Sequence, residues 1–176
     1  MTAPGILEVS VHIAAVPETV FGYFTDPARY VCWMGTEATL NPVPGGSYRV
    51  FMRDGVETIG KFVEVDPPRR LVFTWGWTRD AQVPPGSTRV EVTFAAEDGG
   101  TRVVLRHHDL PTEQGRAQHS AGWQMYLERL VMHASGGDPG PDPNAVPDPN
   151  AVPDPNAVPD PNALADTHPA AGRTQP

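Results

Sequence analysis

Apolar and polar residues alternate along much of the first 108 positions, a pattern typical of strands with one buried face. The first such segment is 6–15, in which every second residue from Leu7 to Ile13 is apolar. Further strands are expected at about 36–41, 47–53, 56–65, 70–77, 87–96 and 101–108. Most are separated by short turns rich in Gly, Pro and Asp, so neighbouring strands are expected to run antiparallel.

The apolar spacing becomes helical in two places. A short helix is expected from Pro17, a residue that suits a first helical position, and Asp26-Pro27 ends it and can cap a second short helix. A long helix is expected from Thr112, its predicted N-cap, to Gly136-Gly137. The residues that share one face of this helix are His119, Trp123, Tyr126, Leu127, Leu130 and Ala134.

This order of elements predicts an α+β fold in which a curved antiparallel sheet wraps around the long C-terminal helix, with two short helices after the first strand. The covered face of the sheet is rich in aromatic residues and also carries the polar atoms of Tyr48, His107 and Tyr126. Buried polar groups need partners, so this face either fills with its own side chains or encloses a ligand cavity. The residue types alone leave both alternatives open.

Composition divides the chain at about residue 135. All fourteen aromatic residues lie at or before Tyr126, whereas eleven of the 21 prolines lie in 136–176. Four hexapeptides fill 142–165, and three of them read Asp-Pro-Asn-Ala-Val-Pro. We therefore expect a folded domain in 1–135 and a disordered Pro/Asp-rich tail with hexapeptide repeats in 136–176. The tail is either a docking segment or spacer, or a low-complexity expansion that binds nothing.

Charge and cysteine content exclude several classes of protein. The formal net charge is −8 and no basic cluster is present, which argues against nucleic-acid binding. No run of about 18 apolar residues occurs, so no membrane-spanning helix is expected. Cys32 is the only cysteine, which rules out an internal disulfide and a multi-cysteine zinc site. No signal-peptide pattern is visible, and a cytoplasmic location is expected.

Several short motifs occur in a characteristic order along residues 6–135. They are Ala15-Val16-Pro17-Glu18-Thr19-Val20-Phe21, Asp26-Pro27, Trp33, Pro44-Gly45-Gly46, the run from Val65 to Trp75, the run from Gly100 to Leu105, and His119 with Gly122-Trp123. Together they resemble the START-related helix-grip (SRPBCC, polyketide cyclase/dehydrase) superfamily, and within it the branch like the homologue of the activator of heat-shock protein 90 ATPase. The resemblance implies the helix-grip fold and no single activity, because members with different ligands share these motifs.

Candidate acid/base chemistry rests on His107 and Glu64. His107 shares a strand face with Leu105 and is a ligand hydrogen-bonder, a general acid/base or a buried structural histidine. Glu64 lies two residues after Phe62, and apolar residues on both faces of that strand leave its direction open. His119 is either a polar group of a pocket or a structural histidine. No residues have metal-ligand spacing, and no cofactor is expected.

We expect the protein to bind a small hydrophobic or amphipathic molecule between the sheet and the long helix, with the loop 78–87 as the rim. The residues expected to line this ligand cavity are Tyr48, Phe73, Trp75, Trp77, Val92, Phe94, Leu105, His107, His119, Trp123 and Tyr126. Two alternatives stay open. One is a cyclase- or dehydratase-type enzyme acting on a polyketide-like substrate through His107 or Glu64, and the other is a co-chaperone-like module that binds a protein partner.

Overall fold

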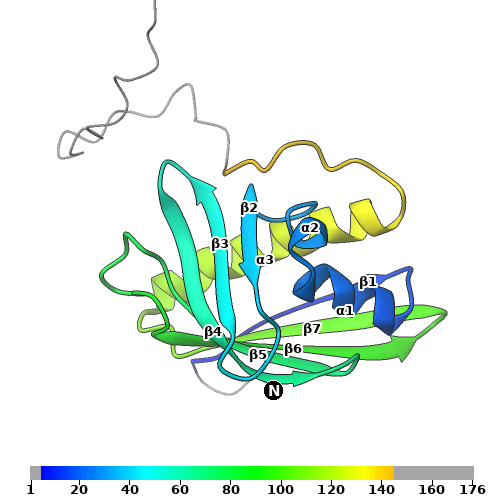
Figure 1. The fold of residues 1–176 in the computed structure, drawn as a ribbon, viewed down its shortest axis with the longest axis horizontal. Helices are drawn as coiled ribbons and strands as arrows, with labels where there is room; N and C mark the ends of the chain where they lie inside the picture. Colours follow the sequence, from blue (N-terminus) through cyan, green and yellow to red (C-terminus); the bar gives the residue numbers. More distant parts are fainter. Residues whose placement is uncertain (1–4, 145–176) are drawn as a thin grey trace, which may run out of the picture. The chain divides into compact units, whose positions relative to one another are not determined.

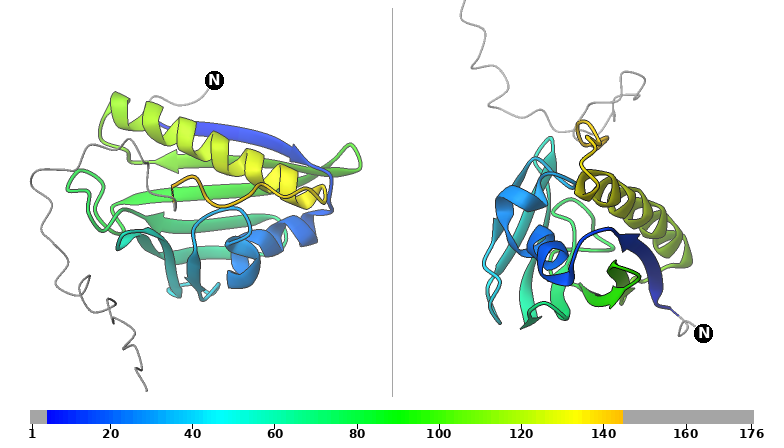
Figure 2. Two further views of the ribbon diagram at one scale, coloured as in Figure 1. Left: turned by 90° about the horizontal axis from the view of Figure 1, so that it is seen from above. Right: turned by 90° about the vertical axis from the view of Figure 1, so that its right-hand side faces the viewer.

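The computed structural model describes residues 5–144, which form one sheet and three helices (Figure 1). In chain order the elements are β1 (Leu7–Ile13), α1 (Pro17–Thr25), α2 (Pro27–Tyr30), β2 (Glu37–Leu40), β3 (Ser47–Arg53), β4 (Val56–Asp66), β5 (Arg70–Trp75), β6 (Thr88–Glu97), β7 (Gly100–His108) and α3 (Glu113–Ala134). The sheet curves around the helices, which lie on its concave side (Figure 2). The predicted α+β helix-grip fold is confirmed.

All neighbouring strands pair antiparallel, in the order β1-β7-β6-β5-β4-β3-β2. From β2 to β7, consecutive strands are neighbours, as the short turns between them predict. Strand β1 pairs with β7 at the far edge, with Leu7 opposite His107 and Ile13 opposite Thr101. Helix α3 follows β7 and packs against β1, so the two ends of the domain lie next to each other.

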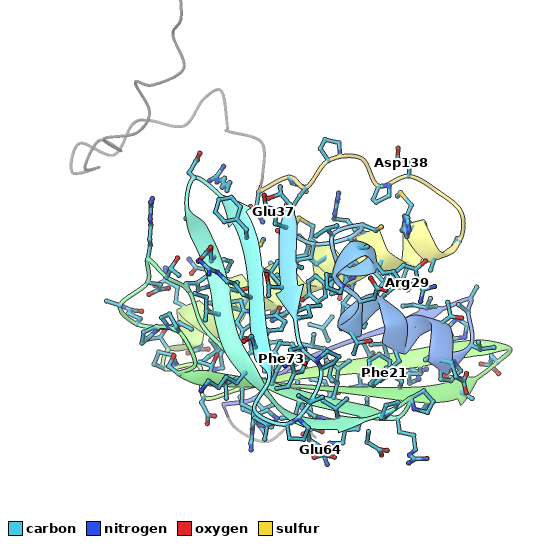
Figure 3. The ribbon with its side chains drawn as sticks, in the orientation of Figure 1. Phe21, Arg29, Glu37, Glu64, Phe73 and Asp138 are labelled. Atoms are coloured by element: carbon cyan, nitrogen blue, oxygen red, sulfur yellow. The ribbon has the colours of Figure 1, made fainter. Side chains whose placement is uncertain are left out.

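A bulge in β4 decides which face its residues occupy. Phe62 lies opposite Phe73 in β5, but Glu64 lies opposite Val72, so the register shifts around Val63. Strict alternation would place Phe62 and Glu64 on the same face, whereas a bulge of one residue separates them. Phe62 is accordingly buried in the core, and Glu64 lies on the face of the sheet that is turned away from α3 (Figure 3).

Strand β5 ends two residues earlier than expected. Trp77 still continues the pairing through an isolated bridge to Thr58 in β4. Between Trp75 and Trp77 in the sequence, the backbone of Gly76 lies so close to the Pro84 carbonyl that no side chain would fit, so only glycine is possible there. The loop 78–87 therefore folds back against the end of β5.

Both ends of α3 have the caps that the sequence predicts. The Thr112 hydroxyl accepts a hydrogen bond from the Gly115 amide at 3.0 Å. At the other end, Gly136 has a φ of 85°, and the Gly137 amide donates to the Met132 carbonyl at 3.0 Å. This is the Schellman arrangement, which turns the chain back along the helix. No helix in residues 5–144 is long and apolar enough to cross a membrane.

The core between the sheet and the helices is strongly aromatic. The ring of Tyr48 stacks on that of Phe73 with centroids 4.4 Å apart, and Phe24 packs on Trp33 at 4.9 Å. Burying an aromatic side chain stabilises the fold by roughly 1.5–3 kcal/mol. The largest fully buried side chains are Trp33, Trp75, Tyr30, Tyr48, Phe24, Phe62 and Phe73.

Past the end of α3, the chain packs back on the domain. Residues 136–144 lie beyond the expected domain boundary at residue 135, and they belong to the same compact unit as the sheet. The Arg129 guanidinium donates to three successive backbone carbonyls, from Pro139 to Pro141, at 2.9–3.2 Å. Of the predicted tail, residues 136–144 are described, and they include the first three residues of the first repeat; residues 145–176, with the rest of the repeats, lie outside the described residues.

Candidate functional site

An open cavity of about 700 Å³ lies between α3 and the ends of strands β3 to β5. This volume is within the range of pockets that hold small organic molecules. Three tryptophans and three methionines provide large apolar surfaces in its wall, and the charged side chains of Arg53, Arg79 and Asp80 also line it. The side chains that line it are Met34, Met52, Arg53, Val56, Trp75, Trp77, Arg79, Asp80, Gln118, His119, Ala121, Trp123, Met125, Tyr126 and Asn144, together with Gly122.

Five of the eleven residues that we expected to line a cavity border this one. They are Trp75, Trp77, His119, Trp123 and Tyr126. The other six are buried in the core away from it, namely Tyr48, Phe73, Val92, Phe94, Leu105 and His107.

The two short helices explain this division of the concave face. Phe21 and Phe24 of α1 pack edge-to-face on Phe94, with centroids 5.3 and 5.2 Å apart. The hydroxyl of Tyr30 in α2 lies 2.7 Å from that of Tyr48. These helices therefore cover the part of the concave face around Phe94 and Tyr48, whereas the cavity lies beside Trp75 and Trp77.

Several lining residues were missed at the sequence level. Met52 is on the same face of β3 as Tyr48, so strand alternation could have identified it. Met34 and Asn144 lie in irregular segments, and no periodicity indicates where their side chains point. The loop 78–87, our expected rim, contributes Arg79 and Asp80 to the cavity, while its Pro84-Pro85-Gly86 motif does not line it.

His107 is fully buried behind the cavity wall, and both of its ring nitrogens are bonded. The Trp123 indole N–H donates to Nδ1 at 3.1 Å, so Nδ1 carries no proton, because an indole can only donate. The proton is therefore on Nε2, which donates to the Thr88 hydroxyl at 2.8 Å. Thr88 in turn donates to the Trp75 carbonyl at 2.8 Å. This directed chain of hydrogen bonds joins α3 to β7, β6 and β5.

The surroundings of His107 keep its imidazole neutral. Burial lowers the pKa of His107 to about 3, and the nearby His119 and His108 rings act in the same direction. A second ring proton would also oppose the indole N–H of Trp123. His107 has no free nitrogen for proton transfer near neutral pH, so this geometry favours a structural histidine over a general acid/base.

His119 stands at the cavity edge and has the opposite tautomer. The Trp77 indole N–H donates to Nε2 at 3.1 Å, so the proton is on Nδ1, which donates to the Gly115 carbonyl at 2.7 Å. The His119 ring meets those of Trp75 and His107 edge-on, with centroids 5.4 and 5.5 Å apart. His119 therefore offers a ring surface to the cavity, with both nitrogens already bonded.

A second cluster of buried polar groups is formed by Trp75, Thr58 and Tyr48. The indole Nε1 of Trp75 and the hydroxyl of Thr58 are buried without a hydrogen-bond partner of good geometry among the described residues. Both are close to the Tyr48 hydroxyl, whose pKa they act to lower, although burial raises it to about 12. Burial also raises the pKa of Tyr30. Both tyrosines are therefore neutral hydrogen-bonding groups.

Glu64 does not reach the cavity. Its carboxylate is 3.5 Å from the Arg70 guanidinium on the outer face of the sheet, and its side chain is 44% exposed. Arg70 also pairs with Glu91 at 3.2 Å. Of the two directions left open for Glu64, the structure has the outward one, because the bulge in β4 turns this residue away from the core, and an acid/base role in the cavity would need the inward one. Among residues 5–144, no group of three His, Cys, Asp or Glu side chains could hold a metal ion.

Comparisons with known proteins agree with this fold. The family described as Activator of Hsp90 ATPase homolog 1-like protein has a model that matches residues 14–134. An AHSA1-like protein from Rhizobium etli is 43% identical, with 78% of this chain and 86% of that one covered and a TM-score of 0.62. CalU16 from Micromonospora echinospora is 27% identical, with 74% and 76% covered and a TM-score of 0.60.

DynU16, described as a protein in the dynemicin biosynthetic locus, is also 27% identical and has a TM-score of 0.67. The match covers 76% of this chain but only 48% of DynU16, so the chain spans about half the length of that relative. No curated protein matched the sequence. The superfamily resemblance inferred from the short motifs is confirmed, and the chain belongs to the Activator of Hsp90 ATPase homolog 1-like family.

Proposed function

We propose that the protein binds a small hydrophobic or amphipathic molecule in the cavity under α3. The observation that carries this proposal is the wall itself, in which three tryptophans and three methionines surround about 700 Å³ of open space. Flat indole rings provide rigid apolar surface, and flexible thioether side chains adapt to the outline of a ligand. A relative from a biosynthetic locus, DynU16, is consistent with a small-molecule ligand.

The rim of the cavity suits a polar end of such a molecule. Arg53, Arg79, Asp80 and Gln118 line the cavity, and Arg79 and Gln118 are exposed, whereas Met34, Met52, Trp75 and Trp123 are buried. Guanidinium groups donate several hydrogen bonds in a fixed geometry and recognise carboxylates well. An apolar body with an oxygen-rich or anionic end therefore matches this distribution of charge.

Binding is better supported than acid/base catalysis at this site. Both ring nitrogens of His119 are bonded within the protein. The Asp80 carboxylate accepts the backbone amides of Gln82 and Val83 at 2.8 and 3.3 Å, which holds it in its own loop. A general acid or base needs a nitrogen or oxygen within reach of the substrate proton, and His119, the one histidine among residues 5–144 that lines the cavity, has no free nitrogen for this role.

Filling the cavity tests the proposal. Gly122 lines the cavity, and an added Cβ there meets nothing within 4 Å. Gly122→Leu places a bulky side chain in this space while improving helix propensity by roughly 0.8 kcal/mol, so folding is preserved. Ala117→Leu is the matched control, because Ala117 is an exposed residue of α3 outside the cavity.

The assay is titration with the fluorescent apolar anion 1-anilinonaphthalene-8-sulfonate. We expect Gly122→Leu to weaken its binding by about tenfold, and Ala117→Leu to leave it unchanged. If both variants bind the dye as the unaltered chain does, the cavity is not the binding site.

A further inference from the structure

The segment 138–144, here called the strap, is held on the domain by a buried carboxylate. Asp142 is 6% exposed, and its Oδ2 accepts the Gly35 amide at 2.7 Å. Its Oδ1 accepts hydrogen bonds from the Tyr126 hydroxyl at 3.0 Å and from the backbone amide of Asn144 at 2.7 Å. Hydrogen bonds to an ionised carboxylate are among the stronger ones in proteins. Asp142 therefore joins the strap to α3 and to the segment between α2 and β2.

Arg129 holds the backbone of the same strap. Besides the three strap carbonyls from Pro139 to Pro141, its Nε donates to the Trp33 carbonyl at 3.0 Å. The strap runs from Asp138 back toward the start of β2, near Glu37 (Figures 1 and 3). One guanidinium and one carboxylate thus account for most of its polar contacts with the domain.

The strap reaches the rim of the cavity at Asn144. The Asn144 Nδ2 donates to the Tyr126 hydroxyl at 2.7 Å, and both residues line the cavity together with Met34. Burial raises the pKa of Tyr126 far above its usual value, so its hydroxyl keeps the proton that it donates to Asp142. Release of Asp142 would detach Asn144 and widen the opening beside Tyr126.

Only the first repeat has the sequence that this docking needs. The Asp-Pro-Asn of 142–144 recurs at 148–150, 154–156 and 160–162. Gly140, two residues before Asp142, has a φ of 71°, in the left-handed region. In each later repeat the corresponding residue is valine, and a β-branched residue is strongly disfavoured in that conformation. The first repeat is therefore the one that has a glycine at this position.

We propose that Gly35, Tyr126 and Arg129 form a docking site for a Gly-Pro-Asp-Pro-Asn segment, that residues 140–144 occupy it, and that this docking narrows the mouth of the cavity. In the docked state the strap acts as a gate that partly covers the mouth of the cavity, and Asp142 of the first repeat holds it there. The effect on ligand entry rests on the proposed function, whereas the docking itself does not.

Hydrogen exchange of the Gly35 amide in the full chain tests the docking. Asp142→Ala removes the acceptor of this amide, and Asp148→Ala removes the same residue type from the second repeat. We expect the first substitution to speed exchange at Gly35 at least about tenfold and the second to leave it unchanged. Unchanged exchange in Asp142→Ala would overturn the docking site.

A rescue variant tests whether the sequence of the motif is recognised. Asp142→Ala combined with Val146→Gly turns 146–150 into a second Gly-Pro-Asp-Pro-Asn. A connection six residues longer costs little entropy, so we expect the protection of Gly35 to return. Asp142→Ala with Ala145→Gly is the control, because its glycine is one position out of register. Failure of Val146→Gly to restore protection, or equal rescue by Ala145→Gly, would overturn recognition of this motif.

Quenching of tryptophan fluorescence by acrylamide tests the gate without any ligand. Three of the four tryptophans line the cavity, so a wider mouth exposes them to the quencher. We expect Asp142→Ala to raise the quenching constant about twofold and Asp148→Ala to leave it unchanged. Unchanged quenching together with faster Gly35 exchange would overturn the gate and leave the docking site. A failure of Gly122→Leu to weaken dye binding would instead count against the proposed function.

Discussion

His107 makes the stability of this fold depend on pH in a way that one substitution removes. Burial lowers the pKa of His107 to about 3 in the folded protein, whereas an exposed histidine in the unfolded chain has a pKa of about 6.5. Between these values the unfolded chain binds one proton more than the folded one. The free energy of unfolding therefore falls as the pH is lowered through this window, by up to about 1.4 kcal/mol for each pH unit.

The size of the effect follows from the two pKa values. Above pH 6.5, His107 is mainly unprotonated in both the folded and the unfolded state, and its contribution to the free energy of unfolding is nearly constant. Between pH 8 and pH 5 the loss is about 2 kcal/mol, and over the whole window down to pH 3 it is about 4 kcal/mol. Small domains are stable by only about 5–15 kcal/mol, so the change at pH 5 is readily measured.

Urea unfolding at pH 8 and pH 5, followed by tryptophan fluorescence, provides the assay. His107→Gln keeps a donor and an acceptor but does not titrate, and His12→Gln is the control in which His107 remains. Between the two pH values we expect the unaltered chain and His12→Gln to lose about 2 kcal/mol more stability than His107→Gln. Equal losses in all three would show that His107 takes up a proton between pH 8 and pH 5 as readily in the folded protein as in the unfolded chain, and would refute its assignment as a buried neutral histidine.

Two further predictions concern the same network. Nitrogen-15 NMR at pH 7 should show His107 with its proton on Nε2 and His119 with its proton on Nδ1; the same tautomer for both rings would contradict the bonds from the two indoles. Trp123→Phe keeps an aromatic ring but leaves the buried Nδ1 of His107 without a donor, so urea unfolding should show a loss of about 1–3 kcal/mol. Trp77→Phe should lower the free energy of unfolding by less, because His119 is partly exposed. Equal losses in the two variants would argue against a special role for the buried hydrogen bond from Trp123 to His107.

The strands and helices were predictable because local signals determine them. Thr112 and Gly136 mark the ends of α3 through their own hydrogen bonds and backbone angles, which depend on neighbours within a few residues. Strand alternation likewise identified the buried face of β5 from Leu71 to Trp75. A bulge is different, since nothing near Val63 in the sequence marks the register shift that turns Glu64 outward.

The cavity was only partly predictable, because alternation shows which face a residue occupies and not what covers it. Tyr48 and Trp75 point to the same side of the sheet, yet Tyr48 meets Tyr30 of α2 while Trp75 borders open space. That difference depends on where α1 and α2 sit, which is decided by packing between distant parts of the chain. The position of Asn144 beside the cavity depends on how the strap packs back on the domain after α3, which local sequence signals do not show.

The side chains that line the cavity include rigid ones and adaptable ones. The indoles of Trp77 and Trp123 are fixed by bonds to histidines, and moving either ring would leave a polar atom unpaired. By contrast, Met52 and Met125 have flexible side chains, and Asn144 belongs to the strap. A ligand of varying shape would therefore be accommodated by the methionines and the strap. The tautomers of the histidines should stay the same when the dye binds, while the methionine methyl groups respond to it.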